Sequence, residues 1–283
     1  MNSFVATRYD EAVQKLALGV EPIDAARGQP MLTPVMLTHD DAAAGTLRQP
    51  FLRHPSNRQS LVYDAYYTPQ ARTVTLRLFD QAEGGYASDR DRRRFVPRRL
   101  RIALPGLAGA ELDAPAARGC RPHLYPGAAY PVADACTGLR AHVMRGALGP
   151  QPLRPARWAR VVATVPATQP DPALATVVGR ACCDDRGEFL LLIGAHPDAI
   201  GPGSTLAVRL HVLARLAVLP LPPLAAQTED PLWDLPIETP ASLADDDPVL
   251  RGVLAPPGFV AVASRVVQLP LGRLLRGQPS LLI

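Results

Sequence analysis

The sequence predicts an all-β fold with a β-sandwich as its main unit, and three observations carry this prediction. Proline accounts for 31 of the 283 residues, about twice the usual share, and it interrupts helices because it lacks a backbone donor. Several segments alternate apolar and polar residues, the pattern of half-buried strands. Glycine- and proline-rich turns separate them. Apolar residues make up 47% of the chain, which provides for a packed core and excludes wholesale disorder.

Residues 1–60 are expected to form an irregular N-terminal arm. Val5, Tyr9, Val13 and Leu16 lie at helical spacing, which allows a short amphipathic helix. The glycines and prolines that follow would end it. We expect this arm to pack along a domain or a neighbouring subunit rather than to fold alone.

Residues 61–135 are expected to form a small β unit and a loop. Apolar and polar residues alternate over 73–78 and again over 99–104, which predicts two strands of one unit. A loop rich in arginine and aspartate connects them. Residues 105–135 are rich in glycine, alanine and proline and are expected to be mostly loop.

Residues 136–219 carry the clearest strand pattern. Strands are expected over 138–145, 158–165, 176–183, 188–193 and 205–218. Between two of them, Asp-Asp-Arg-Gly at 184–187 predicts a tight turn in which Gly187 takes a positive φ. For 205–218 a helix is the alternative, since four of its apolar residues share a helical face. We prefer the strand because the two-residue alternation of side chains (period two) is more regular there and because valine, which favours strands, occurs repeatedly.

Residues 220–283 are expected to form an extended, proline-rich C-terminal arm, with strands allowed at 250–254 and 259–269. The chain ends in Leu-Leu-Ile. An apolar end is unfavourable in water, so it should be buried in its own fold or against a partner.

Three motifs stand in the central block: Gly-Leu-Arg-Ala-His-Val at 138–143, Ala-Arg-Val-Val-Ala at 159–163, and Asp-Asp-Arg-Gly-Glu-Phe-Leu at 184–190. Together they make residues 136–219 resemble the carboxypeptidase regulatory-like domain, a transthyretin-like, Ig-like β-sandwich. The chain departs from that family in a longer, proline-rich loop at 145–157. It also has Gly201 to Ser204 where the family has a glycine-plus-tyrosine signature.

This resemblance implies a non-catalytic module that serves as a spacer, an adhesion module or an assembly contact. Modules of this kind also occur in phage-tail-like contractile injection particles. A subunit of such a particle is therefore among our expectations.

Charge and composition favour protein partners over other kinds. The formal net charge of +4 is small and spread along the chain, so nucleic acid is not expected. Aromatic residues make up 5% of the chain, which is few for a surface on which sugar rings stack. No apolar run approaches the roughly 18 residues of a membrane span. Residues 1–20 lack the apolar core of a signal peptide, so we expect synthesis in the cytoplasm, with release as part of a particle left open.

Catalytic and metal motifs are not evident. The six histidines are scattered, and no serine stands in a Gly-x-Ser-x-Gly elbow. Asp184, Asp185 and Glu188 are explained by turn chemistry, and Asp245–Asp247 by a solvated loop or a helix cap. Cys120 and Cys136 could form a bridge, but reduced thiols are the default in the cytosol, and their redox state stays open. We expect no enzyme activity, cofactor or metal.

Partner contacts are assigned to apolar residues of the C-terminal arm and to an arginine cluster. The residues are Trp233, Leu235, Ile237, Leu281, Ile283, Arg92, Arg93 and Arg94. An acidic protein surface suits the arginines better than nucleic acid does. The sequence thus predicts a structural, oligomeric or assembled protein. The alternative is a ligand- or carbohydrate-binding accessory module.

Overall fold

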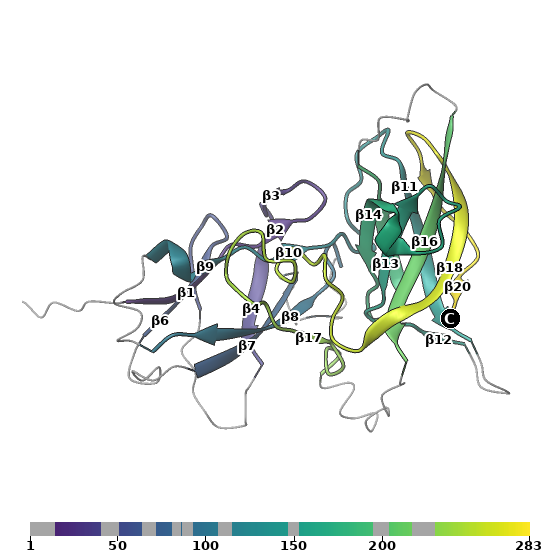
Figure 1. Cartoon of the computed structure of the whole chain (residues 1–283). Coiled ribbons are helices and arrows are strands. Elements are labelled where there is room, and N and C mark those ends of the chain that lie inside the picture. Colours follow the sequence, from purple (N-terminus) through teal and green to yellow (C-terminus); the bar gives the residue numbers. More distant parts are fainter. Residues whose placement is uncertain are drawn as a thin grey trace, which may run out of the picture.

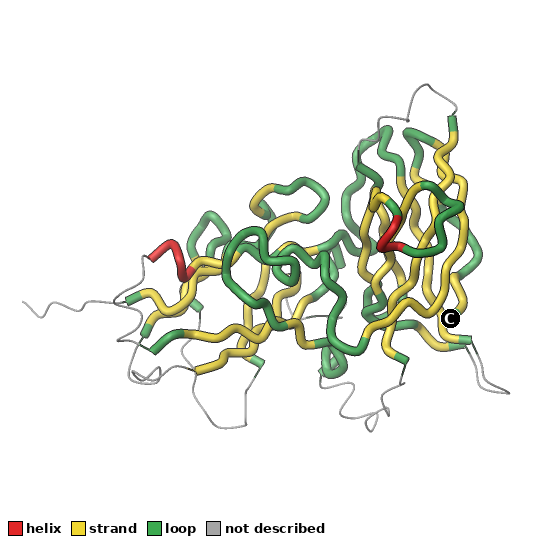
Figure 2. Tube along the Cα trace, viewed as in Figure 1, coloured by secondary structure: helices red, strands yellow, loops and turns green. Residues whose placement is uncertain are grey.

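The computed structural model describes residues 15–40, 51–63, 72–80, 86, 93–106, 115–146, 153–194, 204–216 and 230–283. The prediction of an all-β fold is confirmed, since these residues form strands and two short 3-10 helices but no α-helix (Figure 2). The 3-10 helices are η1 (Pro115–Arg118) and η2 (Pro172–Leu174). The strands gather into two groups, here called the first and second unit (Figure 1).

The first unit contains three sheets. One has the order β5-β6-β1-β9, formed by β5 (Leu52–Arg53), β6 (Gln59–Val62), β1 (Leu16–Val20) and β9 (Gly119–Cys120). A second has the order β10-β2-β3, formed by β10 (His123–Leu124), β2 (Ile23–Asp24) and β3 (Gln29–Pro30). The third has the order β17-β8-β7-β4, formed by β17 (Ile237–Glu238), β8 (Arg98–Leu104), β7 (Arg72–Asp80) and β4 (Val35–His39).

The second unit is a sandwich of two sheets. One has β12 (Arg154–Pro155), β11 (Gly138–Arg145) and β15 (Glu188–Leu192), and β11 also pairs with β19 (Leu274–Leu275) and β20 (Leu281–Leu282). The other has the order β14-β13-β16-β18, formed by β14 (Thr176–Cys182), β13 (Arg160–Val165), β16 (Thr205–Arg215) and β18 (Phe259–Pro270). Side chains from both sheets share one core.

The central block folds as its local pattern predicts. All five expected strands form, and 205–215 is a strand, so the helical alternative is wrong. Gly187 has a φ of 74°, as the turn requires. The nearly all-apolar β15 is buried on both faces: Phe189 and Leu191 lie in the core of the second unit, and Leu190 lies in that of the first. The two units are therefore packed directly against each other.

The N-terminal segment is not an irregular arm where the structure describes it. β1 pairs with β6 and β4 pairs with β7, and Leu18 and Val35 belong to the core of the first unit. The expected helix falls mostly before residue 15, outside the described residues, and Leu16 begins a strand. The expectation fails because these short strands find their partners far along the chain, beyond the reach of local periodicity.

The described C-terminal residues belong to both units rather than to a separate arm. β17 pairs with β8 of the first unit, and the chain then crosses to the second unit, where β18 pairs with β16 along its whole length. Of the two allowed strands, 259–269 is confirmed as β18. Residues 250–254 form turns instead, because the Asp247 carboxylate accepts the backbone N–H groups of Val249 and Leu250.

Candidate functional site

The most unusual polar feature of the described structure is a buried ionic cluster where the two units meet. It consists of Arg98 on β8, Glu238 on β17, Arg160 on β13 and Cys182 on β14, and is called the junction cluster below. The two carboxylate oxygens of Glu238 accept Arg98 Nε at 3.0 Å and Nη2 at 2.8 Å. Arg160 Nη2 from the second unit donates to the same carboxylate at 2.8 Å. One carboxylate thus joins both units.

The Arg98 guanidinium uses all its hydrogen-bond donors inside the protein. Besides Glu238, its Nη1 donates to the carbonyl oxygens of His123 at 2.9 Å and Leu250 at 2.7 Å, and its Nη2 donates to that of Val249. All five guanidinium N–H groups therefore have acceptors. An arginine in this state positions the 249–250 turn and has no donor left for a ligand.

The junction cluster holds two guanidinium groups against one carboxylate. Burial raises the pKa of Glu238, but the charges of Arg160 and Arg98 outweigh this and hold the pKa below its usual value. Arg160 Nη1 also donates to the Cys182 sulfur. Burial raises the pKa of Cys182, so the thiol stays protonated and unreactive at neutral pH.

Two further carboxylates cross-brace the units. Asp234 accepts Trp158 Nε1 and Arg157 Nη2, each at 2.8 Å. Asp185, in the β14–β15 turn, accepts the Tyr86 hydroxyl at 2.7 Å and Arg93 Nη1 at 2.6 Å. Charge-assisted bonds of this kind are strong and directional, so they fix the relative orientation of the two units.

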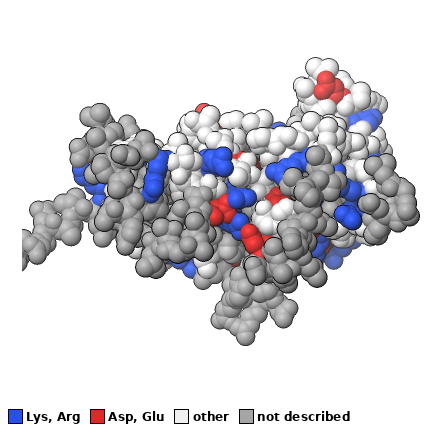
Figure 3. Space-filling view, turned by 90° about the horizontal axis from the view of Figure 1, so that it is seen from below, with Lys and Arg blue, Asp and Glu red and all other residues white. Residues whose placement is uncertain are grey.

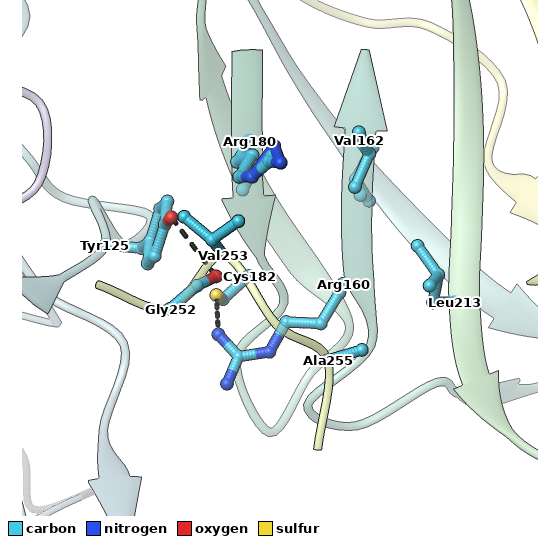
Figure 4. A pocket seen from close by; sticks show the side chains of 11 residues that line it. Tyr125, Arg160, Val162, Arg180, Cys182, Leu213, Gly252, Val253 and Ala255 are labelled. Atoms are coloured by element: carbon cyan, nitrogen blue, oxygen red, sulfur yellow. Dashed lines mark hydrogen bonds between the residues drawn. The ribbon is translucent and has the colours of Figure 1, made fainter. Parts of the chain in front are cut away.

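A small cavity lies beside the junction cluster (Figure 4). Tyr125, Arg160, Cys182 and Gly252 are among its lining residues, and the Arg160 side chain reaches across it toward Cys182. Its volume is about 50 Å³. That is room for a few waters at most, against roughly 300–1,000 Å³ for a typical small-molecule site. The cavity suits a packing defect better than a substrate pocket.

The remaining titratable groups do not converge on a reactive centre within the described ranges. Burial raises the pKa of Cys120 to about 12, and that of Cys183 well above its usual value. All four cysteines are free, including Cys120 and Cys136. His211 is buried against the Thr164 hydroxyl at 2.9 Å. Within the described part of the chain, no group of three or more His, Cys, Asp or Glu residues could hold a metal ion.

The apolar residues predicted to contact a partner lie within the protein's own fold. Leu235 and Leu281 are 3% and 6% exposed. Ile237 pairs with Arg99 in the β17–β8 ladder, and the half-buried Ile283 donates its backbone N–H to Met144. Trp233 is half-buried in the turn that leads to Asp234. Leu235 is buried in an apolar cluster with residues of both units, and Leu281 in the core of the second unit, so the chain itself covers both side chains.

The arginines predicted to contact a partner are also used internally. Arg93 pairs with Asp185, and Arg94 pairs with Asp80 at 3.3 Å. Arg92 lies outside the described residues. Arg93 and Arg94 are therefore used in internal ion pairs. On the face seen in Figure 3, basic side chains lie at several separate places with acidic ones among them.

Sequence reasoning missed three exposed apolar side chains on strands of the second unit. Val260 and Val266 of β18 are 41% and 45% exposed, and Leu282 of β20 is 58% exposed. The sequence allows a strand over 259–269, but the place of that strand at the edge of a sheet depends on which strands pair.

No protein-family model matches the chain, and a search of curated proteins finds no match. Among the helices in the described ranges, none is long and apolar enough to cross a membrane.

Proposed function

We propose that this protein is a non-catalytic structural protein that binds protein partners as a rigid two-unit scaffold. The observation that carries the proposal is the cross-bracing. Three buried or half-buried carboxylates accept hydrogen bonds that hold one unit against the other; they belong to Glu238, Asp234 and Asp185. Such an arrangement suits a protein that transmits a fixed geometry to its neighbours.

Exposed apolar side chains, Val260 and Val266 of β18 and Leu282 of β20, support the binding of a protein. Their strands contribute other side chains to the core of the second unit. A rigid, partly apolar surface can be buried on a partner without a large ordering cost. Membership of the carboxypeptidase regulatory-like family and of a contractile injection particle remains a prediction from the sequence.

The alternative, a carbohydrate-binding accessory module, has less support. Sugar-binding sites rely on aromatic faces open to solvent. Trp158 is 4% exposed and its indole N–H is bonded to Asp234, and Trp233 is half-buried. Glycan binding that Trp233→Ala abolishes would favour this alternative.

The test is the mass of the native complex. A tagged chain, expressed at its natural level and purified under native conditions, should sediment well above the 30.3 kDa of the single chain, with partners in fixed stoichiometry. The double change Val260→Thr and Val266→Thr should reduce that mass. Leu174→Ser, at a 74% exposed leucine on η2, is the matched control and should leave it unchanged. A monomer without stoichiometric partners would contradict the proposal.

A further inference from the structure

β18 presents an open edge. It is the last strand of its sheet, and residues 259–270 pair with β16 on one side. On the other side, within the described part of the chain, no backbone hydrogen bond reaches residues 260–270. The opposite edge of the same sheet differs, because Gly194 N–H donates to the Val178 carbonyl of β14. A long strand with one unpaired edge is a template for another strand.

A pocket opens beside this edge, between β18 and β20. These strands belong to the two facing sheets, so the pocket lies at the seam of the sandwich. Its volume is about 290 Å³. Val212 and Leu281, which belong to the core of the second unit, contribute to its lining, so part of its wall is apolar. The pocket can therefore take an apolar side chain.

Arg265 stands at this pocket. It pairs with Leu210 in the β16–β18 ladder, and paired residues point to the same side of a sheet. Leu210 is buried in the core of the sandwich, so Arg265 points toward the seam. Among the residues that the structure describes, Arg265 has no hydrogen-bond or ion-pair partner. An unpaired inward-pointing charge discourages indiscriminate edge pairing and favours a strand with the opposite charge.

A second copy of this chain does not meet that requirement at its own β18. Residues 259–270 contain Arg265 and no acidic residue, so two β18 strands would supply no carboxylate to each other. Like charges brought together across strands are destabilising. The occupant must therefore differ from β18.

We propose that an extended segment of a protein partner adds to the open edge of β18, inserts an apolar side chain into the seam pocket, and sets a carboxylate against Arg265. The required pattern is an apolar and an acidic residue two positions apart, because such residues share one face of a strand. This inference rests on the proposed function and names where and how the partner binds.

The test uses a short peptide that alternates threonine and valine, with one valine replaced by glutamate, and matched versions carrying glutamine or lysine there. Binding to the full-length protein is measured by fluorescence anisotropy, and the site by backbone amide shifts over 260–268. The glutamate version should bind roughly five-fold more tightly than the glutamine version, as expected for a partly exposed ion pair. Arg265→Gln should remove this preference, and Arg265→Glu should transfer it to the lysine version.

Two further variants control the result. Ala263→Phe, which fills the seam pocket, should weaken all three peptides. Arg101→Gln, at an exposed arginine of β8, should change nothing. Absence of binding by the glutamate peptide up to its solubility limit would overturn the inference, as would a glutamate preference that survives Arg265→Gln. If the double variant Ala263→Phe, Arg265→Glu leaves the native complex intact, the site proposed here is refuted, while the proposed binding of protein partners is not.

Discussion

Replacing Glu238 with glutamine tests whether the junction cluster holds the two units together. Glu238 is 2% exposed and accepts three hydrogen bonds of 2.8–3.0 Å from Arg98 and Arg160. Glutamine keeps the shape but removes the charge, so two buried guanidinium groups lose their counter-ion. Breaking a buried pair in this way costs about 3–5 kcal/mol. At roughly 2–4 °C per kcal/mol for a domain of 150–250 residues, Tm should fall by about 6 °C or more.

Urea unfolding followed by tryptophan fluorescence and by circular dichroism is the appropriate assay. Trp158 is bonded to Asp234 at the junction, and Trp233 lies next to that aspartate, so fluorescence reports on the junction while circular dichroism reports on all the sheets. In Glu238→Gln the fluorescence transition should move to lower urea and precede the loss of sheet signal.

Glu21→Gln is the matched control. Glu21 also lies between two arginines, with Arg58 Nε at 2.6 Å and Arg121 Nε at 3.0 Å, but their side chains are 66% and 40% exposed. Solvent screens such a pair, so the change should cost less than about 1 kcal/mol. Equal effects of the two substitutions would refute the reasoning, because burial would then not decide the strength of the pair.

Other predictions concern the turn and the buried histidine. Gly187→Ala should destabilise the protein by more than about 2 kcal/mol, because φ is 74° and the new Cβ would clash with the Val143 carbonyl oxygen. Gly28→Ala, where φ is 64° and no atom lies near the new Cβ, should cost about 1–2 kcal/mol from the backbone conformation alone. Equal unfolding midpoints of the two variants in urea would contradict this prediction. Burial and Arg209 lower the pKa of His211, so the unfolded chain takes up the proton first and stability should decline as pH falls below about 6.5. His211→Gln should flatten that decline between pH 7 and pH 5, as measured by thermal unfolding across ~pH 5–8; an unchanged slope would contradict the assignment.

The local pattern predicted most strands of the central block but not their partners. Period two over 138–145 and 205–215 reflects the alternation of side chains along each strand, which is a property of the segment itself. It does not say that β18 completes the sheet beside β16 or that β17 joins β8. Those pairings send the C-terminal segment into both units, which is why a separate arm was expected and is not found.

The partner residues illustrate the same limit. Leu235 and Leu281 are apolar residues of proline-rich segments, which favours a partner contact on the local pattern, but both are buried in the protein's own interior. Arg98 was one of many arginines in a charged stretch. Its counter-ion Glu238 lies 140 positions away, so no local pattern could have joined the two.

By itself, the amino-acid order determined the all-β class, the strands of the central block and the positive φ at Gly187, because each depends on backbone preferences within a few residues. Tertiary structure alone decided that Arg98, Arg160 and Glu238 meet, and that β18 keeps a free edge beside Arg265. Such contacts depend on which distant strands pair, and the pairing is determined by the burial of apolar side chains from the whole chain.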